Sequence, residues 1–296
     1  MVLYAVSTEP VRAVCADSVA LALYRARPTA VRAAPPVLLV HGTFSNRNFF
    51  LGQHERGFAR YLAERGFDAW VAELRGHGRS GEAGRASAWH FEDWIRLDAP
   101  ALIAQVRAET GSDRVVWVGH SAGGIIGLAF AGLAHPRSPD IGGLVMVGSP
   151  APTGLGVLQL PMAAAALTIT RLMGRFPARL IGIGPEDEHR GIMQQWMRWN
   201  LTGRWHGEDG TDYFANCARV TAPLLALAGA GDWALAPPSL CEDLVDATTS
   251  DDRTFVTCGR AEGFSENFNH NRVLVSAPAR REVWPLIADW IESRFA

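Results

Sequence analysis

The 296-residue sequence predicts an α/β fold in which helices flank a mostly parallel central sheet. Short, wholly apolar runs alternate with longer amphipathic segments, as expected for strands buried on both faces and the helices that connect them. Apolar residues make up 48% of the chain, which is enough for a sizeable core. The alternation breaks once, between residues 151 and 221, and this break predicts an insertion.

The first half of the chain supplies most of the predicted sheet. Residues 11–15 and 19–25 flank a short polar turn and are expected to pair as a hairpin. Apolar runs predict buried strands at residues 37–40, 68–74, 115–118 and 144–147. The longer segments between these strands predict helices at residues 57–65, 91–109 and 122–133.

The second half returns to the sheet after the insertion. Residues 224–228 and 254–257 predict two further strands, and residues 281–294 carry apolar side chains at helical spacing. We therefore expect residues 1–150 and 222–296 to form one core, with residues 151–221 as a helical lid inserted after the sixth strand. Ligand sites in such sheets lie beyond the carboxyl ends of the strands, where an insertion would cover them.

Composition and charge limit the kinds of ligand and partner that the chain is expected to bind. The net charge is −2 without a basic stripe, so nucleic acid is not an expected partner. The four cysteines lie far apart, without a CxxC motif, and are interpreted as small buried side chains; one disulfide stays open. We expect no metal and no organic cofactor. No segment resembles a signal peptide or a membrane span, which favours the cytoplasm, and a homo-oligomer stays open.

The pattern Gly119-x-Ser121-x-Gly123 identifies a candidate nucleophile, Ser121. The pattern alone is weak, but here it follows an apolar strand and opens a helix, which is the setting in which a serine sits at a strained turn. Side chains at the two glycine positions would clash with the strand and the helix. The alternative is an ordinary glycine-rich turn.

Two further loops are expected near this turn. The run His41-Gly42-Thr43-Phe44 follows a strand, so the N–H groups of Thr43 and Ala122 are the expected oxyanion-hole donors, with Phe44 in place of Thr43 as the fallback. His41 is interpreted as structural. The turn at residues 75–80 lacks the lysine and helix of a phosphate-binding loop and is interpreted as scaffold, with His77 not catalytic.

A nucleophilic serine needs a base and an acid that orients the base. Asp232 follows the strand at residues 224–228 on a glycine-rich turn, and His270 is the only histidine after it. We predict Asp232 as the acid and His270 as the base. The alternatives are a turn aspartate bonded to its own backbone and an ordinary histidine. His120, next to the nucleophile, is expected to point elsewhere.

In this order, the motifs resemble the α/β-hydrolase superfamily across nearly the whole chain: His41-Gly42, residues 75–78, residues 119–123, residues 229–232 and His270. Residues 41–47, 89–94 and 98–101 resemble a subgroup of acid-lipase-like hydrolases and polyhydroxyalkanoate synthases. Those synthases use a cysteine nucleophile, so Ser121 implies hydrolysis. Dehalogenases and epoxide hydrolases of this fold use aspartate there, and Ser121 argues against them too.

The apolar residues of the predicted lid indicate which kind of substrate the chain would accept. Met193, Trp196 and Trp199, with two neighbours, lie at helical spacing within residues 191–200, and they either pack against the core or line an apolar acyl pocket. Residues 162–167 predict a second lid helix, and the acidic residues 185–188 suit a helix start with no further role. We expect cleavage of a small, partly apolar carboxylic ester through an acyl-enzyme. Amide or thioester cleavage and non-catalytic ligand binding are the alternatives.

Overall fold

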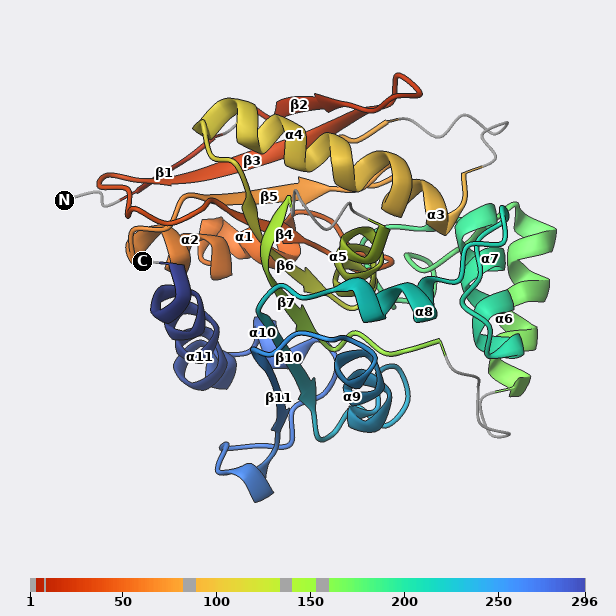
Figure 1. Cartoon of the computed structure of the whole chain (residues 1–296). Coiled ribbons are helices and arrows are strands. Elements are labelled where there is room, and N and C mark those ends of the chain that lie inside the picture. Colours follow the sequence, from red (N-terminus) through yellow and green to blue (C-terminus); the bar gives the residue numbers. More distant parts are fainter. Residues whose placement is uncertain (1–3, 8, 82–88, 134–139, 153–159, 296) are drawn as a thin grey trace.

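A single large sheet runs through the chain in this computed structural model, which describes residues 4–7, 9–81, 89–133, 140–152 and 160–295 (Figure 1). Its strands are β1 (Tyr4–Val6), β2 (Val11–Val14), β3 (Ala20–Pro28), β4 (Val37–Val40), β5 (Ala69–Glu73), β6 (Val115–His120), β7 (Ile141–Val147), β10 (Leu224–Gly229) and β11 (Arg253–Cys258). Among the described residues the sheet has nine strands in the order β1-β3-β5-β4-β6-β7-β10-β11, with β2 paired to β3.

Every neighbouring pair from β5 to β11 is parallel, and the antiparallel strands β1, β2 and β3 form one edge. The predicted mostly parallel sheet, its opening hairpin and its six further strands are therefore confirmed. The short strand β1 was not predicted, so the insertion follows the seventh strand in chain order and not the sixth.

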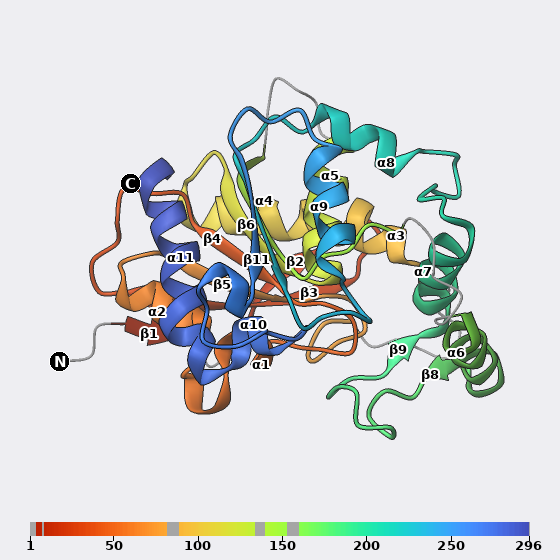
Figure 2. The same cartoon turned by 90° about the horizontal axis from the view of Figure 1, so that it is seen from below.

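The strands are wholly apolar because both faces of the sheet are covered. Val37 and Leu39 of β4 belong to one hydrophobic cluster, and Leu38 and Val40 belong to another. The first cluster takes in α1 (Asn48–Leu51), α2 (Phe58–Glu64), α10 (Arg272–Val275) and α11 (Ala277–Phe295). The second takes in α3 (Phe91–Asp93), α4 (Ala99–Thr110), α5 (Ala122–Leu133), α8 (Tyr213–Asn216) and α9 (Pro238–Asp246). Figure 2 shows α2 and α11 on the opposite side of the strands from α4 and α5.

The predicted helix at residues 91–109 is helical throughout, but a π-helical turn, η2 (Trp94–Asp98), separates α3 from α4. This turn carries Asp98, which is fully buried and accepts hydrogen bonds from the backbone N–H of Arg75 at 2.9 Å and from its Nε at 2.7 Å. Arg75 is equally buried. The pair ties the turn at residues 75–80 to the helix layer, in keeping with its predicted role as scaffold.

The insertion contains α6 (Leu160–Met173), the hairpin strands β8 (Arg175–Phe176) and β9 (Glu188–His189), and α7 (Arg190–Thr202). These elements gather at one end of the molecule in both views (Figures 1 and 2). Helices α6 and α7 contain the two predicted lid helices, whereas the hairpin was not predicted. Trp205, Tyr213 and Cys217 belong to a sheet cluster. The division into core and lid stays a prediction. Short 3₁₀ turns lie at η1 (Gln53–Glu55), η3 (Cys217–Arg219) and η4 (Arg260–Glu262).

All four cysteines, Cys15, Cys217, Cys241 and Cys258, lie in the described residues as buried free thiols, as predicted. The thiol of Cys15 donates to Asp98 at 3.4 Å. Within the described ranges, we find no helix with both the length and the apolar content to cross a lipid bilayer.

We expect Asp98→Asn to lower the free energy of unfolding by about 3–5 kcal/mol, because it leaves the buried Arg75 guanidinium without its buried counter-charge. The matched control is Asp17→Asn, which removes a partly exposed partner of Arg75 and is expected to cost about 1 kcal/mol or less. Urea unfolding followed by tryptophan fluorescence measures both. Equal losses in the two variants would contradict the role given to Asp98.

Candidate active site

Ser121 occupies a strained turn between β6 and α5. Its φ is 53°, a left-handed conformation that costs a non-glycine residue on the order of 1–3 kcal/mol. Two hydrogen bonds hold it: the N–H of Ser121 donates to the carbonyl of Val147 at 2.8 Å, and Ser149 Oγ donates to the carbonyl of Ser121 at 2.9 Å. The neighbouring strand β7 and the segment that follows it therefore hold the turn in its strained conformation.

Close backbone packing explains the glycine after the serine. A Cβ on Gly123 would lie 2.1 Å from the carbonyl oxygen of Val40 in β4, far inside van der Waals contact. The indole of Trp117 donates to the carbonyl of Gly123 at 2.8 Å, so the strand before the turn also holds the helix after it. The strand–turn–helix setting predicted for the Gly-x-Ser-x-Gly pattern is confirmed.

His270 and Asp232 come together from two loops that follow β11 and β10. His270 Nδ1 lies 2.6 Å from Asp232 Oδ2, and the carboxylate is 4% exposed. Burial alone would raise the pKa of Asp232, but the hydrogen bond and charge of His270 outweigh it and lower the pKa below its ordinary value. Asp232 Oδ1 also accepts the N–H of Leu235 at 3.1 Å. An ionised Asp232 leaves Nδ1 of His270 as a donor and Nε2 free to accept a proton.

His120 departs from its expected orientation. The residue is part of the lining of the same cavity as Ser121, and its Nε2 donates to the carbonyl of His270 at 2.9 Å. It also stacks on Phe49, with 4.2 Å between ring centroids. Burial and the neighbouring His270 lower the pKa of His120 well below its ordinary value, so the ring is neutral and supports the His270 loop. Sequence alone offered no signal for this contact.

The loop at residues 41–47 approaches the turn closely. A Cβ on Gly42 would lie 2.8 Å from Cβ of Ser121. His41 is fully buried, its Nδ1 donates to the carbonyl of Gly42 at 2.8 Å and its Nε2 accepts the N–H of Leu74 at 3.3 Å. Burial and the nearby His77 lower the pKa of His41 to about 3, which keeps the ring neutral, in agreement with its predicted structural role. Phe44 has a positive φ of 62°.

The turn at Ser121, the loop at residues 41–47 and the loop that carries His270 meet at a cavity of about 250 Å³. Ser121, His270, Thr43, Phe44 and Ala122 all line it, as do two of the predicted pocket residues, Met193 and Trp196. The rest of the lining is mostly apolar and includes Ala163, Ala166, Phe176, Ile183, Met197 and Leu235.

Trp199 is not part of this lining. Its side chain is 1% exposed, packs edge-on against Phe91 with 5.2 Å between centroids, and donates from Nε1 to the carbonyl of His206 at 2.7 Å. It lies seven residues after Ile192 and shares the face of α7 that packs into the core cluster. Helical spacing placed the apolar residues on α7 but could not separate the cavity face from the core face.

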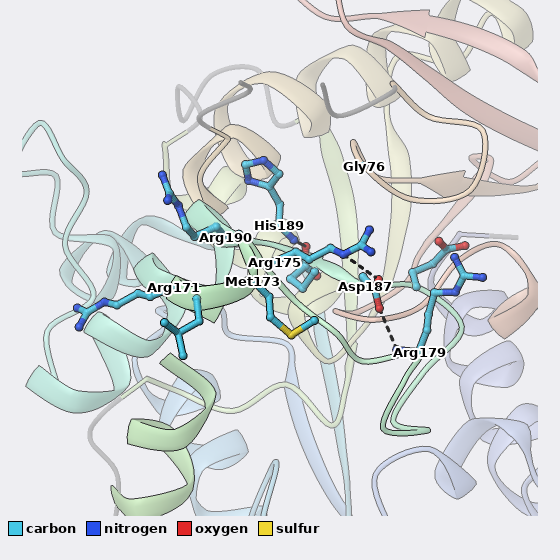
Figure 3. A pocket seen from close by; sticks show the side chains of 12 residues that line it. Gly76, Arg171, Met173, Arg175, Arg179, Asp187, His189 and Arg190 are labelled. Carbon is cyan, nitrogen blue, oxygen red and sulfur yellow. Dashed lines mark hydrogen bonds and ion pairs between the residues drawn. The ribbon is translucent and has the colours of Figure 1, made fainter. Parts of the chain in front are cut away.

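The acid-rich segment 185–188 makes tertiary contacts and does not start a helix. Glu188 and His77 are both 1% exposed, with Oε2 and Nε2 3.3 Å apart. Asp187 pairs with Arg175 at 3.4 Å and accepts the N–H of Arg179 at 3.0 Å (Figure 3). Helix α7 begins later, at Arg190, with His189 as its N-cap. The expectation that this segment has no further role is wrong, because its carboxylates are committed to tertiary contacts.

A second hollow, of about 700 Å³, lies beside this segment and is lined by Gly76, the end of α6 and the hairpin β8–β9 (Figure 3). Its lining is rich in charged residues: four arginines, Arg171, Arg175, Arg179 and Arg190, and the acidic residues 186–188. Neither Ser121 nor His270 lines it, so the larger hollow is not where the candidate nucleophile and base meet.

Known proteins resemble this chain in fold and, over part of its length, in sequence. A family model described as alpha/beta hydrolase fold matches residues 35–264, which is most of the chain. This chain belongs to the alpha/beta hydrolase fold family. A thermophilic esterase from Thermogutta terrifontis superimposes on this family member with a TM-score of 0.65 and 18% identity, covering 98% of this chain and 100% of that one. At that identity the likeness shows the fold alone.

Relatives by sequence cover a shorter part of this hydrolase-fold chain. Triacylglycerol lipase 1 of Arabidopsis thaliana is 32% identical over 135 residues, 42% of this chain and 34% of its own length. Human lysosomal acid lipase/cholesteryl ester hydrolase is 30% identical over 117 residues, 36% of this chain and 28% of its own. The matched segments span about a third of those relatives. An acid lipase is thus among them, in agreement with the subgroup resemblance.

The buried contact between Glu188 and His77 predicts a pH-dependent stability. Burial by itself lowers the pKa of His77, but the Glu188 carboxylate outweighs it and raises the pKa above the ordinary value of 6.5. Because the folded state then binds the proton more tightly, the contact stabilises the fold below that ordinary value, and this contribution is lost as the pH rises through the raised pKa.

Glu188→Gln is therefore expected to lower the free energy of unfolding more at about pH 6 than at about pH 9. Urea unfolding of both proteins at the two pH values measures the difference. Glu266→Gln, which removes an exposed partner of Arg272, is the control and is expected to show no such change between the two pH values. A loss of unfolding free energy that is the same at both pH values, or larger at pH 9, would contradict the predicted stabilisation by the contact between Glu188 and His77.

Proposed function

We propose that this chain hydrolyses carboxylic esters, with Ser121 as the nucleophile, His270 as the general base and Asp232 as the residue that orients His270. The observation that carries the proposal is the cavity in which Ser121 and His270 share one lining while His270 Nδ1 is bonded to the buried Asp232 at 2.6 Å. A neutral imidazole held in that tautomer directs its unprotonated nitrogen away from the carboxylate, where it can accept a proton.

The reaction follows from these roles. Ser121 Oγ attacks the ester carbonyl carbon as its proton passes to His270 Nε2, and the carbonyl oxygen becomes an anion. The C–O bond to the alcohol then breaks, and His270 gives its proton to the leaving oxygen, which leaves an acyl group on Ser121. Water attacks this acyl-enzyme, again losing a proton to His270, and the free acid departs as Ser121 regains its proton. Asp232 stabilises the imidazolium at each stage.

Backbone N–H groups stabilise the oxyanion. Ala122 is the first residue of α5, where N–H groups lack intrahelical partners and the helix dipole favours negative charge. Thr43 lines the cavity from the facing loop and supplies the second donor, with Phe44 as the fallback. Each well-placed donor contributes roughly 3 kcal/mol to lowering the barrier.

The cavity lining favours an uncharged acyl group with a hydrocarbon portion. Among the lining residues that the structure describes, none is Lys, Arg, Asp or Glu. Residues of α6 and α7 line the cavity together with Ser121, which supports the proposal that residues 151–221 act as a lid over a core of residues 1–150 and 222–296. A charged acyl chain would lose its hydration there without gaining a counter-charge.

We expect a fluorophosphonate probe to label Ser121 in the folded protein and Ser121→Ala to lose both labelling and ester cleavage. His270→Ala is expected to lower kcat/KM for a p-nitrophenyl ester by several orders of magnitude, because no other group takes the serine proton. His206→Ala changes an exposed histidine of the insertion and serves as the control with unchanged activity.

Mass spectrometry detects whether the probe has labelled Ser121, and initial rates measure ester cleavage by each variant. An unlabelled Ser121 in folded protein would leave a non-catalytic ligand-binding role, and full activity in His270→Ala would remove His270 as the base. Rates on a matched p-nitroanilide and thioester separate the three acyl-transfer activities.

The cavity predicts an acyl-chain preference. Each methylene that enters it adds about 0.8 kcal/mol, so kcat/KM is expected to rise about fourfold per carbon above acetate until the cavity is full. Ala163→Phe fills the cavity from α6 and shifts the optimum to shorter chains, whereas Ala164→Phe, on the exposed face, leaves it unchanged. A p-nitrophenyl ester series tests this, and an optimum at acetate in the unaltered chain would contradict an apolar acyl pocket.

A further inference from the structure

The loop that carries the proposed oxyanion donor Thr43 and its fallback Phe44 is held from two sides. On the core side, the fully buried Glu73 accepts the N–H of Arg47 at 3.3 Å and pairs with its guanidinium at 3.1 Å. On the side of the insertion, Asn46 Nδ2 donates to Glu186 Oε1 at 2.6 Å. The N–H of Glu186 donates in turn to the carbonyl of Phe44 at 3.1 Å. Glu186 thus bonds to this loop through both its side chain and its backbone.

The segment that presents Glu186 is itself firmly held. Gly184 packs so closely on the loop that a Cβ there would lie 2.2 Å from the carbonyl oxygen of Phe44. On the other side of Glu186, Asp187 is bonded to Arg175 and Arg179, as Figure 3 shows, and Glu188 faces the buried His77. Glu186 is therefore flanked by Gly184, which packs on the loop, and by Asp187 and Glu188, whose contacts hold the segment independently of the loop.

The loop needs such support because Phe44 is strained. Its φ of 62° costs on the order of 1–3 kcal/mol for a residue with a side chain, and such conformations persist where neighbours enforce them. Its ring also packs against Phe176 of β8, with 5.3 Å between centroids. The N–H groups of Thr43 and Phe44 immediately precede the strained Cα of Phe44, so a change in its torsions would redirect both. Oxyanion donors lose most of their effect when displaced by about 1 Å.

We propose that Glu186 is a positioning residue that shapes the oxyanion hole from the insertion, through Asn46 and Phe44. This inference rests on the proposed function. The insertion then does more than bound the acyl cavity, because half of the hole keeps its shape only while residues 184–188 are docked on the loop. Transition-state stabilisation, rather than substrate binding, depends on the Asn46–Glu186 hydrogen bond.

The hydrogen bond between Asn46 and Glu186 can be removed by one substitution and restored by a second. Asn46→Asp keeps Oδ1, which accepts the N–H of Asn48 at 3.0 Å, but replaces the donor to Glu186 with a repelling carboxylate. We expect kcat for a p-nitrophenyl ester to fall on the order of 10²-fold, with KM within about threefold. Glu186→Gln alone retains an acceptor for Asn46 and keeps kcat within about threefold. The double variant is expected to recover most of kcat, because the new amide donates to the carboxylate at position 46.

A second measurement separates positioning from a merely structural role. A trifluoromethyl ketone forms an anionic adduct with the nucleophile, so its inhibition constant is expected to rise in proportion to the fall in kcat/KM across the variants. Glu208→Ala, which removes an exposed ion pair elsewhere in the insertion, is the control and leaves both quantities unchanged.

The outcomes are distinct. Activity that is lost in Ser121→Ala but kept within threefold in Asn46→Asp would overturn the role of Glu186 while leaving the proposed function intact. A loss of kcat in Asn46→Asp that Glu186→Gln does not restore, or an equal rise in KM, would also overturn it. An unaltered chain that cleaves no ester and leaves Ser121 unlabelled would overturn both the proposed function and this inference.

Discussion

The turn between β6 and α5 imposes a strict geometric constraint on the strands around it. Ser121 keeps a left-handed backbone only because β7 and Ser149 hold both of its peptide groups. The same turn brings the backbone of Gly123 against that of β4, so two neighbouring parallel strands must keep their register for the turn to close. A parallel sheet buried on both faces supplies that rigidity, and the strain at Ser121 is held by the packing of apolar strands.

Buried polar groups connect the loops at this edge of the sheet to the layers around it. Asp98 neutralises Arg75, Glu73 holds Arg47, and His41 and His120 stay neutral by burial while each bonds to a nearby carbonyl. Such groups are costly when unpaired, so each of them restricts the loops to one arrangement. The insertion joins the same network through Glu186 and Glu188, and the candidate site is therefore built jointly by the core and the insertion.

The order of strands and helices was largely predictable, because burial on both faces demands continuous apolar runs and the connecting helices show their period in the chain. Residue chemistry singled out Ser121, Asp232 and His270 as candidates. The fold places Ser121 and His270 in the lining of one cavity, with Asp232 bonded to His270. The failures have a common cause. Trp199 packs on Phe91, His120 bonds to the backbone of His270 and Glu186 bonds to Asn46. Periodicity or composition contains no information on partners so far away in sequence.

What the sequence alone determined is the alternation of strands and helices, the family resemblance and the candidate residues for the proposed acyl transfer, because these follow from local propensity, burial pattern and side-chain chemistry. Only the tertiary structure decided which face of α7 lines the cavity, how His120 supports the His270 loop and how Glu186 reaches Asn46 across 140 positions of the chain. Long-range contacts of this kind arise when the loops of a folded sheet meet at one edge, and their partners are set by packing in three dimensions.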